Sequence, residues 1–210
     1  MNNQTMKRVT TILFFGSLWG LIEATLGYLL HFLPVLVAGG ILFPLATGIL
    51  VRTYQVSGKR MDLVLVGFLA AIIKSVNLLM PQISIWKTIN PMMSILFEAL
   101  CVVMVIAVVQ RNQPVIAFAV LPLASIIWRG LYLGYMGIQY QVTGFLSIHL
   151  ESVENILSFV LLYGVMSGLV AGLFAFWIVY LKKRWQLPWE VRATLALPML
   201  GLAILLTAFL

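Results

Sequence analysis

The sequence predicts an all-α protein, a polytopic transmembrane helical bundle with a six-helix core (residues 1–185) and a seventh C-terminal helix (residues 186–210). Of its 210 residues, 62% are hydrophobic and only 9% are charged. A soluble domain of this size has too little interior to hide so much apolar surface. The apolar residues also form long runs, which is typical of helices that cross a bilayer.

A hydrocarbon core about 30 Å thick requires roughly 20 helical residues to cross it. Seven stretches meet or approach that length. The second is short and carries Pro44, so we expect a kinked or incomplete helix there. The sixth is longer than a crossing needs, and we expect its start to lie in the interface. The predicted spans are Val9–Leu30, Val35–Val51, Asp62–Met80, Pro91–Gln110, Pro114–Met136, Glu151–Leu181 and Val191–Leu210.

The basic residues between the spans predict the orientation of the chain. Cytoplasmic loops are enriched in Lys and Arg, so the richer side is assigned to the cytoplasm. With the N-terminus inside, the outer segments contain only Lys87, and the C-terminus lies outside. This orientation predicts a multi-pass protein of the cytoplasmic (inner) membrane. The inner segments then hold Lys7, Arg8, Arg52, Lys59, Arg60, Arg111, Lys182, Lys183, Arg184 and Arg192.

The net charge of +7 could suggest nucleic-acid binding, but these cations occupy short gaps between spans and form no basic-aromatic patch. The sequence has no Gly-rich phosphate loop followed by Lys-Ser/Thr, so any ATP hydrolysis must take place on another chain. Cys101 is the single cysteine, and no Cys/His spacing typical of a metal site is present. We therefore predict no cofactor, no bound metal and no nucleic-acid partner.

Four charged residues fall inside predicted spans: Glu23, Lys74, Glu98 and Arg129. An ionised side chain at the bilayer centre costs at least about 2.5–3.5 kcal/mol, so these residues are expected to face the bundle interior. Each lies six or seven residues from the outer end of its predicted span, roughly 10 Å deep at about 1.5 Å per residue. The sequence thus predicts a charged layer in which two acids and two bases lie at one depth.

Further polar residues extend this layer toward the outer surface by helical spacing. We expect a polar cavity open to the outside and walled by aromatic residues and methionines. Three interpretations remain open: mutual neutralisation of the four charges, binding of a polar ligand, or a proton or metal pathway. The candidate ligand-binding residues are Glu23, His31, Lys74, Asn77, Asn90, Glu98, Arg129, Tyr132 and Glu154, and nearby polar residues include Tyr135, His149 and Glu151.

Small residues recur every four positions on two spans and would let helices approach closely. Span one carries Gly16, Gly20 and Ala24. These residues indicate either internal helix packing or docking onto a partner membrane protein. The same alternatives apply to the sixth span, which carries Gly164, Gly168 and Gly172. The six tryptophans are interpreted mostly as interface anchors or packing groups.

The runs GSLWGLIEATLGYLLHFLP (Gly16–Pro34) and INPMMSILFEAL (Ile89–Leu100), with the basic turn after span two, resemble the substrate-binding S components of energy-coupling factor transporters. The resemblance covers roughly residues 9–185. It implies a six-helix protein that captures vitamins or metal ions from outside and associates with a transmembrane coupling subunit and separate ATPase subunits. It also implies that Gly16, Gly20 and Ala24 dock onto the coupling subunit. The Asn90-Pro91 start of span four would lie on the ligand side, with Glu98 one or two turns deeper.

Two features depart from that family, the seventh helix and a charged layer that suggests a charged or zwitterionic ligand. The leading hypothesis is a membrane-embedded substrate-capture subunit, and not an enzyme. One alternative is an intramembrane metal-assisted hydrolase using His31, His149, Glu151 and Glu154, although no hydrolase motif is present. The other alternative is a non-catalytic membrane scaffold.

Overall fold

The computed structural model of the chain describes residues 3–30, 35–80, 84–110, 114–185 and 193–210, and these residues form helices joined by short connections. Five helical segments are long and apolar enough to cross a membrane, and a shorter apolar helix follows at the C-terminal end. The predicted all-α class is confirmed. The five segments are Gln4–Leu30, Arg60–Leu79, Ile85–Val109, Ile116–Thr143 and Val153–Val179.

The helices match the predicted spans in number and order. Several helices extend well beyond their predicted spans: the first begins at Asn3, the fourth begins at Ile85 and the fifth continues to Thr143. The second helix continues through Pro44 to Ser57. The elements are α1 (Asn3–Leu30), α2 (Val35–Ser57), α3 (Arg60–Lys74), η1 (Ser75–Leu79), α4 (Ile85–Val109), α5 (Pro114–Thr143), η2 (Ile148–Leu150), α6 (Val153–Leu157), η3 (Ser158–Leu162), α7 (Tyr163–Trp185) and α8 (Ala193–Phe209).

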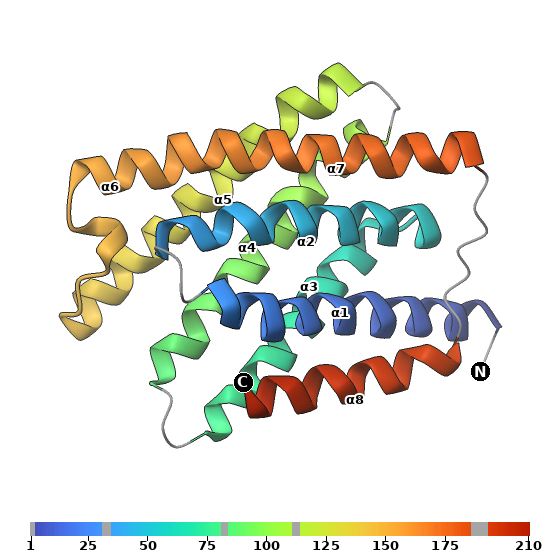
Figure 1. The fold of residues 1–210 in the computed structure, drawn as a ribbon, viewed down its shortest axis with the longest axis horizontal. Coiled ribbons are helices and arrows are strands. Elements are labelled where there is room, and N and C mark those ends of the chain that lie inside the picture. The colour runs from blue at the N-terminus through green and yellow to red at the C-terminus, as the bar shows by residue number, and fades with distance from the viewer. Residues whose placement is uncertain (1–2, 31–34, 81–83, 111–113, 186–192) are drawn as a thin grey trace.

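The helices form two layers (Figure 1). One layer contains α7, α2, α1 and α8 in that spatial order, and the other contains α3, α4 and α5, which lie behind it at an incline. The apolar core between the layers includes Trp19, Phe43, Val66, Val102 and Leu121, each at most 1% exposed. Neighbours in sequence are mostly neighbours in space, as expected for helices joined by short connections.

Large apolar side chains also cover the outside of the bundle. Met104, Leu123, Leu173 and Leu197 are 56–70% exposed, and they come from four different helices. A water-soluble domain rarely exposes contiguous apolar surface of this kind, whereas a membrane protein presents it to lipid. The long apolar helices and this surface identify a multi-pass membrane protein.

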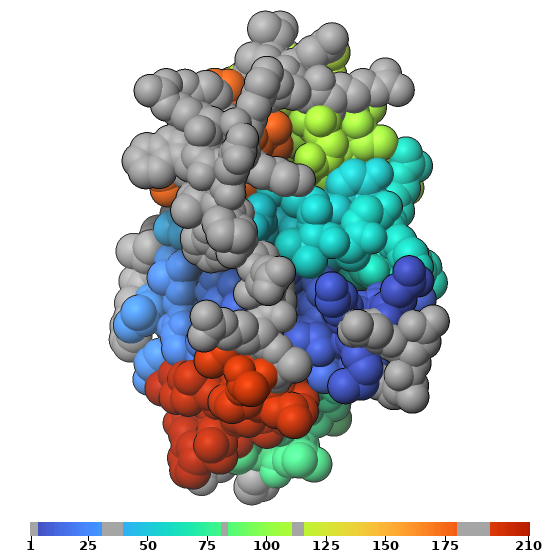
Figure 2. All heavy atoms as spheres, turned by 90° about the vertical axis from the view of Figure 1, so that its right-hand side faces the viewer, coloured from blue at the N-terminus to red at the C-terminus, as the bar shows by residue number. Residues whose placement is uncertain are grey.

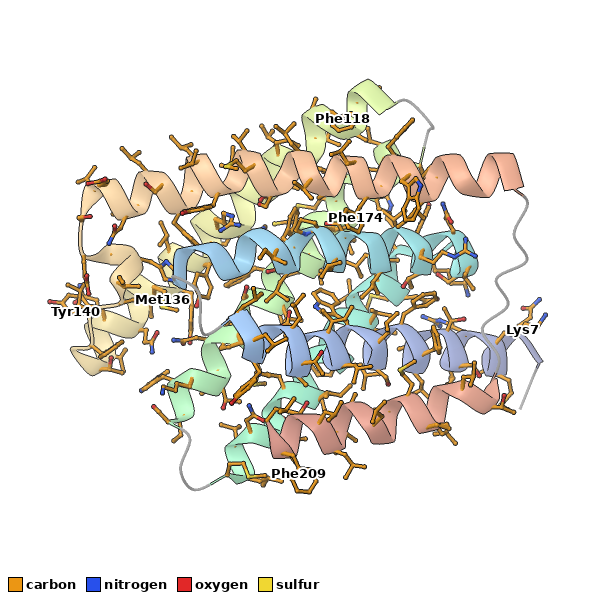
Figure 3. The ribbon with its side chains drawn as sticks, viewed as in Figure 1. Lys7, Phe118, Met136, Tyr140, Phe174 and Phe209 are labelled. Atoms are coloured by element: carbon orange, nitrogen blue, oxygen red, sulfur yellow. The ribbon has the colours of Figure 1, made fainter. Side chains whose placement is uncertain are left out.

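The two ends of the bundle differ in charge. The N-terminus, the α2–α3 connection and the start of α8 lie at one end, where Lys59 and Arg60 are exposed. We call this the basic end. Figure 3 shows Lys7 there, and Met136 and Tyr140 of α5 at the other end. The end of α8 lies away from the basic end, part-way along the bundle (Figure 1).

Helix α8 packs within the bundle, which the sequence left open. It lies against α1 and also contacts α3 and η1. Seen from the basic end, α8 and α1 are side by side (Figure 2). Ala196 and Ala203 of α8 are buried, so the side of the helix that carries these two alanines faces the chain. The boundary predicted between residues 185 and 186 adjoins residues 186–192, which are outside the described part of the chain.

The small-residue ridge on α1 packs inside the chain. A Cβ atom added to Gly16 would lie 2.7 Å from the Leu69 side chain, and one added to Gly20 would lie 2.8 Å from the Ile73 side chain. Ala24, the next member of the ridge, is 2% exposed. This geometry corresponds to the internal-packing interpretation, because α3 covers the face that a partner would need.

The ridge on the sixth span holds α7 against α5. A Cβ atom on Gly168 would lie 2.2 Å from Cα of Pro122, a backbone atom that cannot turn aside. A Cβ atom on Gly172 would lie 2.9 Å from the ring of Phe118, which Figure 3 labels where α5 passes α7. The two backbones can therefore approach this closely only where residue 168 has no side chain.

A part-buried ion pair joins α1 to α3 near the basic end. Nε of Arg8 lies 2.7 Å from Oδ1 of Asp62, and the Asp62 side chain is fully buried. Asp62 also lies in the first turn of α3, where the helix dipole favours a negative charge. The guanidinium and the dipole together compensate for the cost of burying this carboxylate.

A π-helical turn interrupts the long sixth span. Residues Ser158–Leu162 form η3 between α6 and α7, and a π turn contains one more residue than an α turn. Phe159 within it is buried, while Leu161 and Leu162 on its other side are about half exposed. The turn therefore changes which side chains of this span face the bundle.

We predict that Gly168→Ala lowers the stability of the protein, because its Cβ atom would clash with the backbone of Pro122. Overpacking of this kind costs about 1–3 kcal/mol, and the immobile neighbour places the change at the upper end of that range. Thermal unfolding of the protein in detergent measures the effect. Gly134→Ala is the matched control, since no atom lies within 4 Å of its added Cβ. Equal melting temperatures for the two variants would contradict the predicted packing.

Candidate functional site

The four charged residues predicted to lie inside the spans are buried or half-buried in the bundle. Glu23 of α1, Glu98 of α4 and Arg129 of α5 are 6%, 2% and 0% exposed. Lys74, the last residue of α3, is half-buried, and Asn77 in the following 3-10 turn η1 is buried. The four charged residues, together with the neutral Asn77, are called the charged layer below.

Two members of the layer lie farther from the ends of their helices than the predicted spans placed them. Glu98 lies thirteen residues after the start of α4, and Arg129 lies fourteen residues before the end of α5. Both helices extend beyond the predicted spans, and Asn90-Pro91 is inside α4 rather than at its start. Pro91 is the seventh residue of α4, beyond the first turn, so its ring removes one intrahelical hydrogen bond, to the carbonyl of Lys87.

The charges are nevertheless close enough to affect one another. Glu23 is within electrostatic range of Lys74 and of Glu98, and Glu98 is within range of Arg129. The described residues contain no ion pair of 4 Å or less between members of the layer. The acids and bases of the layer are therefore neighbours that do not neutralise each other by direct contact.

Neutral donors hold the two carboxylates instead. Nε1 of Trp19 donates a hydrogen bond of 3.2 Å to Oε1 of Glu23, one helical turn away on α1. The hydroxyl of Ser94 donates one of 3.0 Å to Oε1 of Glu98, again from the preceding turn of the same helix. In each case one carboxylate oxygen is bonded within its own helix, which fixes the side-chain direction.

Aromatic rings enclose the guanidinium of Arg129. Its Cζ atom lies 4.6 Å from the ring centroid of Trp128 and 4.8 Å from that of Phe159. The Phe43 ring stacks on the Trp128 ring, with the two ring centroids 6.0 Å apart. A cation over an aromatic face is attracted by the ring quadrupole, and more strongly when water is excluded. These rings offset part of the cost of burying the positive charge.

A pair of hydrogen-bonded serines contacts the same guanidinium through one of its members. Nη2 of Arg129 donates to Oγ of Ser167 at 3.2 Å, and that oxygen lies 2.8 Å from Oγ of Ser125. Gly164, one turn before Ser167, also lies beside the arginine: a Cβ atom there would be in ordinary contact with Cδ of Arg129 at 3.5 Å and in tighter contact with Cγ1 of Ile126 at 3.0 Å. The α7 face that packs on α5 thus also positions Arg129.

The π turn places Phe159 and Ser167 on one side of the sixth span. Residues eight positions apart in an α-helix are rotated by about 80° relative to each other, since each residue adds about 100°. The extra residue of η3 reduces that difference to about 20°. Phe159 and Ser167 can therefore contact the same arginine from a single continuous helical segment.

Several buried polar atoms of this region have no hydrogen-bond partner among the described residues. In Arg129 they are Nε and Nη1, and in Glu98 the atom is Oε2. Asn77 contributes Oδ1 and His149 contributes Nδ1. Leaving such a group unsatisfied costs about 1–3 kcal/mol, and more when it is charged. The arrangement therefore maintains unused hydrogen-bonding capacity at considerable energetic cost.

Aromatic side chains gather in the part of the site that is farther from the basic end. The hydroxyl of Tyr135 donates to Oδ1 of Asn90 at 2.9 Å, which links α5 to α4. Tyr132 lies between its neighbours, with its ring centroid 6.0 Å from Tyr135 and 5.9 Å from His149. The predicted candidates Asn90 and Tyr132 thus belong to one group of rings and hydrogen bonds next to Arg129.

His149 of η2 completes this group. It is 6% exposed, and its ring centroid lies 4.4 Å from that of Phe159. Burial, together with the smaller effect of the positive charge of Arg129, lowers the pKa of His149 to about 4. The imidazole is therefore neutral at physiological pH and adds no second cation beside Arg129.

Two of the predicted ligand-binding candidates are not placed in the charged layer or in the aromatic group around Tyr132. His31 lies outside the described residues. Glu154 is exposed in the short helix α6, which Ser152 caps by accepting a hydrogen bond from the backbone N–H of Asn155. The described part of the chain does not gather three His, Cys, Asp or Glu side chains as a metal ion would need.

Sequence reasoning missed several residues that contact Arg129. Phe159 and Ser167 were not singled out, and Trp128 was interpreted only as an anchor or packing group. Ser125 lies one turn before Arg129 and shares its helix face, so the i, i+4 spacing could have identified it. No comparable signal exists for Phe159, because the π turn interrupts the helical period.

Comparisons of the chain with models of known protein families, with curated protein sequences and with solved structures find no match. The interpretation of the site therefore rests on its residues and geometry.

We predict that the protein loses stability as the pH falls from about 6.5 toward 4, partly because of His149. In that range the unfolded chain binds a proton at this histidine and the folded chain does not, since its folded pKa is about 4 against an ordinary 6.5. The loss is about 1.4 kcal/mol per pH unit within the range. Melting temperatures of the wild type and His149→Gln, measured from pH 7.5 to 4.5, should converge as the pH falls. Parallel curves would contradict a depressed pKa.

Proposed function

We propose that the protein is the substrate-capture subunit of a nutrient uptake transporter, which binds a small polar or charged ligand from the outer side of the membrane. The observation that carries this proposal is a fully buried arginine and a buried glutamate, close to each other, that both retain unused hydrogen-bonding atoms. Intramembrane ionisable groups are costly and usually mark a substrate or ion path.

Ligand capture accounts for this arrangement better than structural ion pairing does. If Glu23, Lys74, Glu98 and Arg129 served only to neutralise each other, contact pairs would give the largest compensation for burial. Instead the carboxylates bond to Trp19 and Ser94 within their own helices. Groups held in place and left partly unsatisfied are what a polar binding site requires before its ligand arrives.

The proposal extends to orientation and partners. The basic end would lie in the cytoplasm, in line with the distribution of Lys and Arg, and the aromatic group around Tyr132 and His149 would face outward. The sequence contains no motif for ATP binding, so a transmembrane coupling subunit and separate ATPase subunits would supply the energy. The resemblance to S components of energy-coupling factor transporters supports the same division of labour. A coupling subunit would dock on a face other than the α1 ridge, which α3 covers.

We expect the gently purified protein to carry a small molecule that native mass spectrometry detects as a bound species of defined mass. Arg129→Gln and Glu98→Gln should each reduce its occupancy at least about 10-fold, because each removes a charged hydrogen-bonding partner of the ligand. Lys87→Gln is the control, since Lys87 is exposed and outside the charged layer.

The variants must remain folded for this result to count, which size-exclusion chromatography and thermal unfolding establish. Folded variants that keep full occupancy would show that the bound molecule lies elsewhere. A protein that carries no small molecule, and binds none of a panel of vitamins and metal ions, would contradict the capture function.

A further inference from the structure

The chemical class of the ligand can be inferred from the unused atoms of the charged layer. We propose that the ligand is a zwitterion whose oxyanion, a carboxylate or phosphate group, binds to the edge of Arg129 and whose cationic group binds to Oε2 of Glu98. The inference rests on the proposed function and specifies what the captured molecule must carry.

The surroundings of Arg129 determine how a ligand could approach it. The rings of Trp128 and Phe159 each lie less than 5 Å from Cζ, and Ser167 accepts from Nη2. The donors that have no partner among the described residues are those of Nε and Nη1. All N–H groups of a guanidinium lie in its plane, so an acceptor must approach along an edge. Nε and Nη1 lie on different edges, and each edge is completed by one of the two N–H groups of Nη2. Because only one of these two groups donates to Ser167, one edge retains two unused donors, which match two oxygens in a fixed fork, as in a carboxylate or phosphate.

Glu98 provides the complementary charge on a different helix. Its Oε1 atom accepts from Ser94, and its Oε2 atom has no partner in the described part of the chain. Glu23 of α1 is within electrostatic range of Glu98, and Lys74 offsets part of the Glu23 charge. Glu98 therefore carries the negative charge that is left without a nearby cation on the α1–α4 side of the layer. Arg129 instead lies where α5 packs on α7. The layer thus has a positive side and a negative side, to which a dipolar molecule is complementary.

A purely anionic or purely cationic ligand fits this arrangement less well. An anion alone would bind Arg129 but would face two buried carboxylates, and like charges in a water-poor site repel strongly. A cation alone would satisfy Glu98 and leave the arginine edge unpaired. Only a molecule with both charges satisfies the two sets of unused atoms together.

The test uses the full-length protein in phosphatidylglycerol nanodiscs and measures binding by thermal shift and calorimetry. The probes are the twenty common amino acids, glycine betaine and phosphoethanolamine. Each zwitterion that binds is compared with its ester and with the amine that lacks the oxyanion. We expect at least one zwitterion to bind, and its ester and amine to bind at least about 10-fold more weakly.

Variants assign the two ends of the ligand. Arg129→Lys keeps the charge but not the fork, and should weaken binding of the zwitterion about 10- to 100-fold. Glu98→Gln should weaken the zwitterion similarly and weaken the matched carboxylate without an amine much less. Arg8→Lys is the matched control, because Arg8 pairs with Asp62 near the basic end, outside the charged layer. It should leave affinity unchanged.

Three outcomes would overturn the inference: no zwitterion binds, an ester binds as well as its parent acid, or a folded Arg129→Lys variant keeps its affinity. If native mass spectrometry nevertheless finds a bound neutral molecule that is insensitive to Arg129→Lys, capture stands and the zwitterion inference fails. If the bound species in phosphatidylethanolamine nanodiscs is that lipid, and Arg129→Lys releases it, the paired-charge chemistry stands with a lipid headgroup as its source and the capture of a nutrient fails.

Discussion

The close approach of α5 and α7 at Gly168 is the constraint on which the rest of the site depends. At this point a Cβ atom would overlap the backbone of Pro122, so the two helices touch main chain to main chain. The contact brings Gly164 and Ser167 beside Arg129, and Ser167 accepts a hydrogen bond from it. In a bilayer, where hydrophobic burial provides little association energy between helices, such close packing is a major source of stability.

The buried charges reduce the stability that this packing provides. Fixing an arginine and a glutamate in a dry interior without pairing them costs several kcal/mol. Local interactions reduce this cost: two aromatic rings and a serine contact Arg129, and a serine donates to Glu98. These interactions leave part of the hydrogen-bonding capacity of both side chains unused. Stability is therefore sacrificed at one place in the molecule, as is common where a protein must bind a polar molecule.

The sequence predicted the helices well and the site in part, for physical reasons. Apolar runs of membrane-spanning length and the high cost of a charge in lipid made the spans and the burial of Glu23, Glu98 and Arg129 predictable. The ends of α4 and α5 were not, because residues such as Ile85 and Tyr140 extend the helices beyond the runs on which the predicted spans were based. The contacts around Arg129 depend on how α5 meets α7, which hydropathy does not encode.

The π turn has a consequence for how this protein can change over time. Ser158–Leu162 contains one residue more than an α turn. Loss of a single codon between Phe159 and Ser167 would leave seven regular α-helical steps, which place the two side chains about 20° apart, as the π turn does. A substitution that converted the turn into an α-helix of unchanged length would leave eight steps and rotate Phe159 by about 100° relative to Ser167. The position of Phe159 beside Arg129 is therefore more sensitive to substitutions that remove the π geometry than to a single deletion.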